Sequence, residues 1–323
     1  MSRLHQLIKS QGPQNAPGLF SCRPLCLLQA VVFILAVVLI IPTAVHAQLE
    51  NVILVQPPEL SDFPILSVQV KLPYQPDSLS PELDVDQFQI FEDETLVSIH
   101  SVNQARRGVH FTLAVNGGIV FDFRDENGQS PYAKLTDVLL DWGESRTFSE
   151  EDSWSFVTNE GAEIRNTANR QAWVNALQGY QPNFRVMEPQ LTSLETAIDL
   201  ASQRVVQFGV DKALLYITVP LNVDQIVPLR TLSERAASAG IHVFVWMIGD
   251  PYFLTNDQGG ALIELAEITG GAFFHYTAEN DFPDPESYLA PLGKVHTLTY
   301  ESTVRESGSY ASVSYTHLTL PTN

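Results

Sequence analysis

The hydrophobic pattern of this chain has a period of two in one region and a mixed strand-and-helix pattern in the next. Between residues 48 and 108, segments such as ILSVQVKL (Ile65–Leu72) alternate apolar and polar positions, and prolines separate them. Such segments are typical of short strands and not of helices. We therefore expect residues 48–108 to form a small β-sandwich-like module, in which Phe88–Phe91 and Leu96–Ile99 make a hairpin.

From Val109 onward the apolar segments become nearly continuous. VHFTLAV (Val109–Val115), ALLYITV (Ala213–Val219) and IHVFVWMI (Ile241–Ile248) read as strands buried on both faces. Between them, apolar residues recur at spacings of three and four, which predicts amphipathic helices. Strands that alternate with helices imply βαβ units, so we expect an α/β fold with a doubly wound, mainly parallel sheet over residues 109–293.

The strand-like alternation returns after Gly293. His296–Tyr300 is predicted to be a strand, and residues 294–323 are expected to begin a further β unit that is truncated. The ending SYTHLTLPTN resembles translated adapter sequence, so about the last ten residues are expected to be artefactual and the natural protein to continue.

The first 47 residues have the features of a targeting segment. Arg3, Lys9 and Arg23 precede an apolar run from Leu25 to Ile41, and Val45–Ala47 then has the small-x-small pattern of a signal-peptidase site. The length of the run suits both a cleaved signal peptide and a retained membrane anchor. In either case the rest of the chain is expected outside the cytoplasm, secreted or anchored, with membrane contact only through this segment if it is uncleaved.

Charge and cysteine content narrow the function classes. The chain has 18 Lys and Arg residues against 37 Asp and Glu, a net charge of −19. An acidic surface repels phosphate backbones, so we expect no nucleic-acid partner. Both cysteines, Cys22 and Cys26, lie in the targeting segment, which leaves the remainder of the chain without disulfides or thiolate metal sites.

Several segments of residues 109–293 resemble a von Willebrand factor type A (VWA) domain. The resemblance is carried by ALLYITV, by GIHVFVWMIGD (Gly240–Asp250) and by LAEITGGAFFHY (Leu265–Tyr276). The preceding LDVDQFQIFEDETLVSI (Leu83–Ile99) resembles the β module that often precedes bacterial A domains. The resemblance implies a VWA fold in an exported bacterial protein.

The family carries a metal-ion-dependent adhesion site at the carboxyl edge of its sheet. That site uses D-x-S-x-S after the first strand, a Thr before the third helix and an Asp after the fourth strand. By position these become Asn116, Gly118, Val120, Thr192 and Val219, so both carboxylates and both serines are missing. One amide and one hydroxyl are a poor ligand set for Mg²⁺, which dehydrates reluctantly. The site is therefore expected to be degenerate and to hold no cofactor.

Two alternatives remain open. Asp122 and Asp125, in the loop after the first strand, could hold a relocated Mg²⁺ or Ca²⁺ and make the protein a metal-dependent adhesin. A hydrolase using carboxylates at this edge is the other alternative, although the sequence has no G-x-S-x-G, H-E-x-x-H or phosphate-binding loop.

The sequence thus predicts a non-catalytic, exported protein that mediates protein–protein interaction or adhesion at the cell envelope. Loops at the carboxyl ends of the strands vary without disturbing the core, so we expect the contact surface there. Several of their residues are of the types enriched at interface hot spots or carry charge. The candidate contact residues are Arg124, Asp125, Tyr180, Phe184, Arg185, Tyr252 and Phe253; the alternative is that the aromatic ones fold back onto the helices.

Overall fold

The computed structural model describes most of the chain after the targeting segment. The described residues are 53–74, 83–146, 149–203, 207–277, 279–304 and 312–313. The predicted signal peptide or anchor and the residues after 313 lie outside these ranges. Within them, no helix has both the length and the apolar character needed to cross a membrane.

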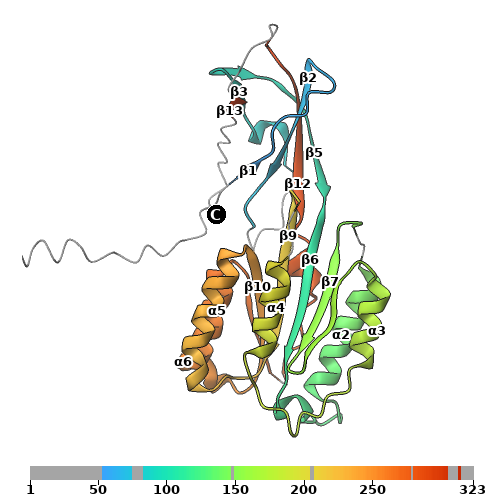
Figure 1. The fold of residues 1–323 in the computed structure, drawn as a ribbon, viewed down its shortest axis with the longest axis vertical. Helices are drawn as coiled ribbons and strands as arrows, with labels where there is room; N and C mark the ends of the chain where they lie inside the picture. Colours follow the sequence, from blue (N-terminus) through green and yellow to red (C-terminus); the bar gives the residue numbers. More distant parts are fainter. Residues whose placement is uncertain are drawn as a thin grey trace, which may run out of the picture. The chain divides into compact units, whose positions relative to one another are not determined.

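A six-stranded sheet forms the centre of the α/β domain, in the order β11-β10-β9-β6-β7-β8 (Figure 1). Its strands are β6 (Gly108–Asn116), β7 (Ser153–Thr158), β8 (Gly161–Thr167), β9 (Val210–Thr218), β10 (Ile241–Ile248) and β11 (Phe273–Tyr276). Neighbouring strands are parallel except for β7 and β8. The predicted doubly wound, mainly parallel sheet is confirmed.

Helices cover both faces of this sheet, and each face has its own apolar core (Figure 1). Leu215 and Ile217 of β9 pack with one group of helices, and Leu214 and Tyr216 with the other, because successive side chains of a strand point to opposite faces. The first group is α2 (Pro131–Ser145), α3 (Arg170–Gly179) and α7 (Glu286–Leu289). The second is α4 (Thr192–Ser202), α5 (Ile226–Ser238) and α6 (Asp257–Ile268). Burial on both sides explains the continuous apolar runs in the sequence.

A β module of two smaller sheets accompanies the α/β domain. One sheet has the order β1-β2-β12-β5, and the other β13-β3-β4. The strands are β1 (Leu54–Val55), β2 (Ile65–Lys71), β3 (Ile90–Glu92), β4 (Thr95–Val97), β5 (Ile99–Arg106), β12 (Lys294–Glu301) and β13 (Ser312–Val313). β3 and β4 pair antiparallel, as expected of the predicted hairpin. In β2, alternate residues are buried, which matches the period of two.

The position of β12 corrects the expectation that residue 294 begins a further β unit. β12 lies between β2 and β5 and pairs antiparallel with both. Leu298 and Tyr300 pack in the same core as Leu66 and Val68. Residues 294–301 therefore complete the sheet of the β module, and the α/β domain is inserted between two strands of that sheet.

Two adjacent chain segments connect the β module with the inserted domain. The backbone N–H of Arg107 donates to the carbonyl of Gly293 (2.7 Å). Gly293 has a φ of +68°, and a Cβ there would lie 2.6 Å from the carbonyl oxygen of Gly108, so only glycine fits. Asp211 of β9 pairs with Lys71 of β2 and accepts a hydrogen bond from the N–H of Gly293 (2.7 Å). The segments through which the chain enters and leaves the inserted domain are thus joined by a backbone hydrogen bond and by the contacts of Asp211.

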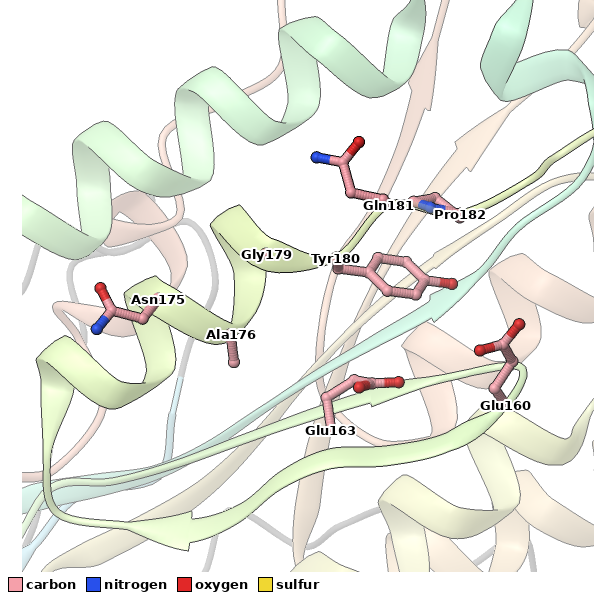
Figure 2. Close-up of a pocket in the computed structure, with 8 residues that line it drawn as sticks. All are labelled: Glu160, Glu163, Asn175, Ala176, Gly179, Tyr180, Gln181 and Pro182. Carbon is pink, nitrogen blue, oxygen red and sulfur yellow. The ribbon is translucent and has the colours of Figure 1, made fainter.

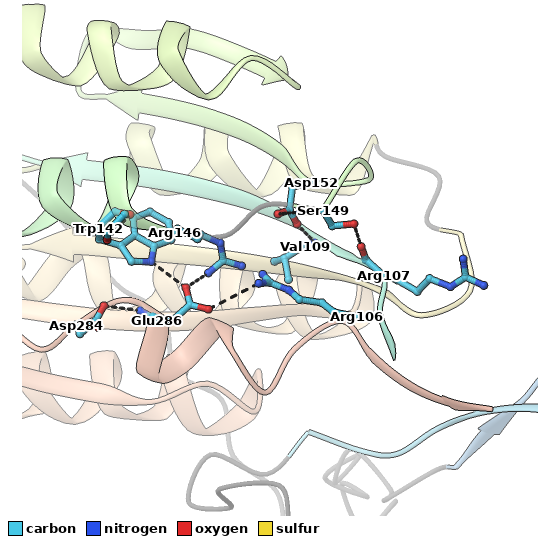
Figure 3. A network of polar contacts seen from close by, with 10 residues as sticks. Arg106, Arg107, Val109, Trp142, Arg146, Ser149, Asp152, Asp284 and Glu286 are labelled. Atoms are coloured by element: carbon cyan, nitrogen blue, oxygen red, sulfur yellow. Dashed lines mark hydrogen bonds and ion pairs between the residues drawn. The ribbon is translucent and has the colours of Figure 1, made fainter. Parts of the chain in front are cut away.

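A second polar cluster joins α2, α7 and β5 (Figure 3). The side chain of Arg146 is 1% exposed, pairs with the carboxylate of Glu286, and its guanidinium lies 5.4 Å from the Trp142 ring centroid. Glu286 also accepts from Trp142 Nε1 (3.0 Å) and lies 3.7 Å from a guanidinium nitrogen of Arg106. Burial raises the pKa of Glu286. A buried guanidinium without its carboxylate would be strongly destabilising, so this cluster is structural.

The β module contains a buried histidine on β12. His296 is 3% exposed, pairs with Val70 of β2, and its ring centroid lies 5.9 Å from that of Phe88. Neither ring nitrogen has a hydrogen-bond partner among the described residues. Burial, and then the nearby charge of Lys294, lowers the pKa of His296. The folded module therefore favours the neutral imidazole.

We expect acidification to destabilise the fold through His296. Below the unfolded-state pKa of about 6.5, the unfolded chain binds a proton that folded His296 does not, so the free energy of unfolding falls by up to about 1.4 kcal/mol per pH unit. Urea unfolding between about pH 7.5 and pH 5 should show a shallower fall for His296→Leu than for wild type. Some slope should remain, because burial also lowers the pKa of His242.

His100, exposed on β5, provides the matched control. His100→Leu controls for the loss of a histidine and for the added apolar side chain. Parallel curves for wild type and His296→Leu would contradict this account of His296.

Candidate functional site

The candidate site lies at the carboxyl ends of β6, β9 and β10, where ligands bind in open α/β sheets. Three short 3₁₀ helices follow these strands: η2 (Ile119–Asp122), η3 (Val223–Gln225) and η4 (Pro251–Thr255). The loops that contain these helices, residues 117–130, 219–225 and 249–256, and the link between α3 and α4, residues 180–191, form what we call the rim. The rim contains most of the positions that the sequence predicted to be functional.

The side chain of Asn116, at the end of β6, is completely buried and makes four hydrogen bonds. Its Nδ2 donates to the hydroxyl of Tyr216 (3.0 Å) and to Oγ1 of Thr218 (2.9 Å). Its Oδ1 accepts from Nδ2 of Asn159 (3.0 Å) and from the backbone N–H of Gln190 (2.9 Å). A primary amide has two donor hydrogens and two acceptor lone pairs. The hydrogen-bonding capacity of Asn116 is thus fully used inside the protein.

The groups around Asn116 are also electrically neutral. Asn159 accepts from the N–H of Gly117 (2.8 Å) and donates to the carbonyl of Glu188 (3.1 Å). Burial raises the pKa of Tyr216 to about 12, so its hydroxyl keeps its proton at ordinary pH. A divalent cation at this place would face amides and hydroxyls with no carboxylate to balance its charge, which is a poor environment for a hard ion.

Apolar side chains close the space above the two glycines that follow Asn116. A Cβ on Gly117 would lie 2.6 Å from Sδ of Met187 and 2.7 Å from Cε1 of Phe184, so these side chains pack directly on the glycine backbone. A Cβ on Gly118, where the family has a serine, would lie 3.1 Å from Cγ of Pro189. Residues 184–189 therefore cover the place where the family site would open to solvent.

The structure brings three of the five family positions together. Asn116 is buried, Gly118 lies below Pro189, and Val219 is 3% exposed and part of the apolar core. Val120 packs against the edge of that core. Thr192 differs, because its side chain is exposed and contacts Oε1 of Gln190 (3.4 Å) rather than Asn116.

The two candidate carboxylates of the loop after β6 are paired with basic side chains. Oδ2 of Asp122 lies 3.2 Å from Nε of Arg185, and Oδ2 of Asp125 lies 2.8 Å from Nζ of Lys134. Oδ1 of Asp125 accepts two backbone N–H groups of its own loop, and the hydrogen bond from Lys134 lowers its pKa. Within the described ranges, no three His, Cys, Asp or Glu side chains are grouped so that they could hold a metal ion.

The predicted contact residues divide between surface and core. Phe184 is 6% exposed and stacks on Phe121, with ring centroids 5.1 Å apart, so the prediction that it contacts a partner is wrong. It packs inward because the loop 184–189 folds over the ends of the strands. Phe253 is half-buried against the core under α6, whereas Tyr252 is 69% exposed. Arg124 and Arg185 are exposed but bind the carbonyl of Gly128 and Asp122, respectively.

Tyr180 lines an open cleft of about 400 Å³ between α3 and the turn that joins β7 to β8 (Figure 2). Figure 2 shows its ring beside the carboxylates of Glu160 and Glu163. Burial raises the pKa of Tyr180 to about 12. The hydroxyl of Thr158 donates to Glu163 (3.1 Å), so one carboxylate is already engaged. The sequence did not predict this cleft, because the half-exposed, charged edge strand β8 lacks an apolar pattern.

The rim also exposes large apolar residues that the sequence reasoning missed. In the sequence, the signal for them is that large apolar residues occur in loops, outside the periodic segments that predict strands and helices. Besides the predicted Tyr252, the exposed side chains on the rim and the start of α5 are Ile119, Phe123, Val186, Val223 and Val227. Exposed apolar groups that gather in one region are typical of interaction sites.

Comparisons with known proteins find only distant structural likenesses. No protein-family model and no curated protein matches the chain. An aerotolerance-related membrane protein from Bacteroides fragilis is similar at 15% identity and a TM-score of 0.37, over 54% of this chain and 93% of that one. The SpRpn10 VWA domain is similar at 11% identity and a TM-score of 0.39, over 53% and 88%. The TFIIH p34 N-terminal domain is similar at 15% identity and a TM-score of 0.35, over 54% and 92%. Likenesses this distant say nothing about function.

We expect Asn116→Asp to destabilise the protein without creating a magnesium site. The new carboxylate would be buried among neutral groups and could no longer donate hydrogen bonds, which should cost about 1–3 kcal/mol. Urea unfolding with and without Mg²⁺ measures both effects. Asn175→Asp, the same change at an exposed position of α3, should cost little. If Mg²⁺ restored the stability of Asn116→Asp to that of wild type, the place of Asn116 would be open to a metal ion, contrary to the structure.

Phe184→Ala and Tyr252→Ala should differ sharply in stability. Removing the buried Phe184 ring leaves a cavity beside Phe121 and should cost about 3–5 kcal/mol, whereas the exposed Tyr252 ring should cost about 0.5 kcal/mol or less. The urea midpoints of the two variants measure the difference. Similar losses in both variants would show that the loop does not pack on the core in solution.

Proposed function

We propose that this chain, whose α/β domain has the fold of a von Willebrand factor type A domain, is a non-catalytic protein-binding module that works without a metal ion. The proposal places the protein outside the cytoplasm, at the cell envelope, where it binds another protein through the rim. Export is inferred from the basic and apolar pattern of residues 1–47.

The observation that carries the proposal is the hydrogen bonding of Asn116. Where the family site needs a carboxylate, this chain has a buried amide whose four hydrogen bonds all go to protein groups. A ligand held through a metal would require these bonds to break and the apolar cover of Phe184 and Met187 to move away. Each buried group left unsatisfied costs about 1–3 kcal/mol, which favours binding without metal.

A relocated cation at Asp122 and Asp125 has less support. Each carboxylate pairs with a basic side chain, and Asp125 also fixes its own loop through two backbone N–H groups. A metal would have to displace Lys134 from Asp125 and would still lack most of the six to eight oxygen ligands that Ca²⁺ requires.

The exposed surface of the rim supports a protein partner. Ile119, Phe123 and Tyr252 present large apolar surfaces to solvent on loops that are held by a well-packed sheet. Interfaces are enriched in aromatic side chains at their centre, and rigid presentation lowers the entropic cost of binding. Apolar contact of this kind needs no metal.

Capture of envelope proteins by the purified full chain tests the proposal. Capture from the native host should be the same in EDTA as in millimolar Mg²⁺. The double substitution of Val223 and Tyr252 by Ser, both exposed on the rim, should reduce it several-fold. The control Leu60→Ser changes an exposed apolar residue of the β module and should have no effect. Capture that is lost in EDTA, or that is unchanged in the Val223 and Tyr252 double variant, would contradict the proposal.

A further inference from the structure

We infer that the segment recognised by the rim is basic and inserts one large apolar or aromatic side chain into a cleft beside Phe123. This inference rests on the proposed function and specifies the chemistry of its partner. Two features carry it, namely the size and lining of the cleft and the balance of paired and unpaired charges around it.

The cleft has a volume of about 200 Å³ and lies between the loop after β6 and the ends of β10 and β11. Its apolar walls come from Val120, Phe123, Pro131 and Ile248, and Phe123 is 58% exposed at its edge. Pockets that take whole small molecules usually measure about 300–1,000 Å³. The smaller volume and open apolar wall suit a single side chain of a protein partner.

Basic side chains at this cleft are already engaged. Arg124 donates to the carbonyl oxygen of Gly128 (2.8 Å), and Lys134 pairs with Asp125 (2.8 Å). On the neighbouring part of the rim, Arg185 pairs with Asp122. Lys134 and Arg185 are therefore not available to an acidic ligand without loss of an ion pair, whereas Arg124 forms no ion pair within the described ranges and keeps its charge.

Several acidic side chains in the loops that contribute to the cleft are exposed and form no ion pair within the described ranges. Each follows closely on a residue that lines the cleft, in the loops after β6, β10 and β11. These residues are Glu126, Asp250, Glu279 and Asp281. Four acidic side chains without an ion pair stand against one such cation, Arg124, so the charge of these residues is net negative, and a basic segment complements it.

The same charge argues against other occupants. Nucleic acids and anionic lipid surfaces carry phosphate and would be repelled by the acidic rim. A second copy of this chain, with a net charge of −19, would bring a like-charged surface to it. A family-type ligand, which offers a carboxylate to a metal, would meet the wrong sign. A Lys- or Arg-rich segment with an apolar anchor meets both requirements.

Three synthetic peptides test the inference with the full chain. The first is acetyl-Lys-Lys-Gly-Phe-Gly-Lys-Lys-amide, the second has Glu in place of every Lys, and the third has Ala in place of Phe. Fluorescence anisotropy at low salt should show the first peptide binding at least about tenfold more tightly than the other two. High salt should weaken its binding, because the contributing charges are exposed.

Variants locate the binding. Phe123→Ala should weaken the first peptide about fivefold or more, and Asp250→Asn combined with Glu279→Gln should reduce its preference over the Glu peptide. Leu60→Ala, a change of an exposed apolar residue of the β module, is the matched control and should leave binding unchanged. Both single-residue changes are on the surface, so folding is expected to be retained.

The outcomes separate this inference from the proposed function. No binding of the first peptide up to about 1 mM, equal binding of the Glu peptide, or indifference to Phe123→Ala would overturn the inference. Self-association of the chain that depends on Phe123 would also overturn it. In those cases the proposed function would still hold if capture of envelope proteins were unchanged in EDTA and reduced in the Val223 and Tyr252 double variant.

Discussion

The arrangement of the rim depends on the amide of one buried residue. Asn116 connects its own strand β6 to β9 through Tyr216 and Thr218, and to two loops through Asn159 and Gln190. Hydrogen bonds in a buried, low-dielectric place are strong when complete and costly when broken. The four bonds hold β6, β9 and the two loops together. A neutral amide thus fixes the geometry of these loops.

Much of the fold is predictable from the sequence because local pattern and tertiary environment agree. The apolar runs of β6, β9 and β10 reflect burial on two faces, and the alternation of β2 reflects burial on one. β12 alternates in the same way, yet nothing local indicates that its partners are β2 and β5, which precede it by a whole domain. Pairing over such distances is decided by three-dimensional contacts that residue patterns do not contain.

The sequence predicts where the candidate site lies, but it predicts only part of the contacts that its side chains make. The end of β6 is recognisable from the glycines after Asn116, and the missing carboxylates are visible in the sequence. The hydrogen-bond partners of Asn116 are not, because they come from distant segments. Phe184 and Phe123 are chemically identical residues in loops, but one is buried on Phe121 and the other is exposed. Only the path of the loops distinguishes a core residue from a contact residue.

The insertion of the α/β domain has a consequence for the order in which the chain matures. β12 occupies the middle of the β module's larger sheet, and it is synthesised only after the complete α/β domain. Until then, β2 and β5 have an open gap between them with unpaired edges, which are prone to wrong pairing. Domains generally fold as units during synthesis, the earlier ones first. Here the module that begins first must finish last, so a folded α/β domain is what brings β12 back to its partners.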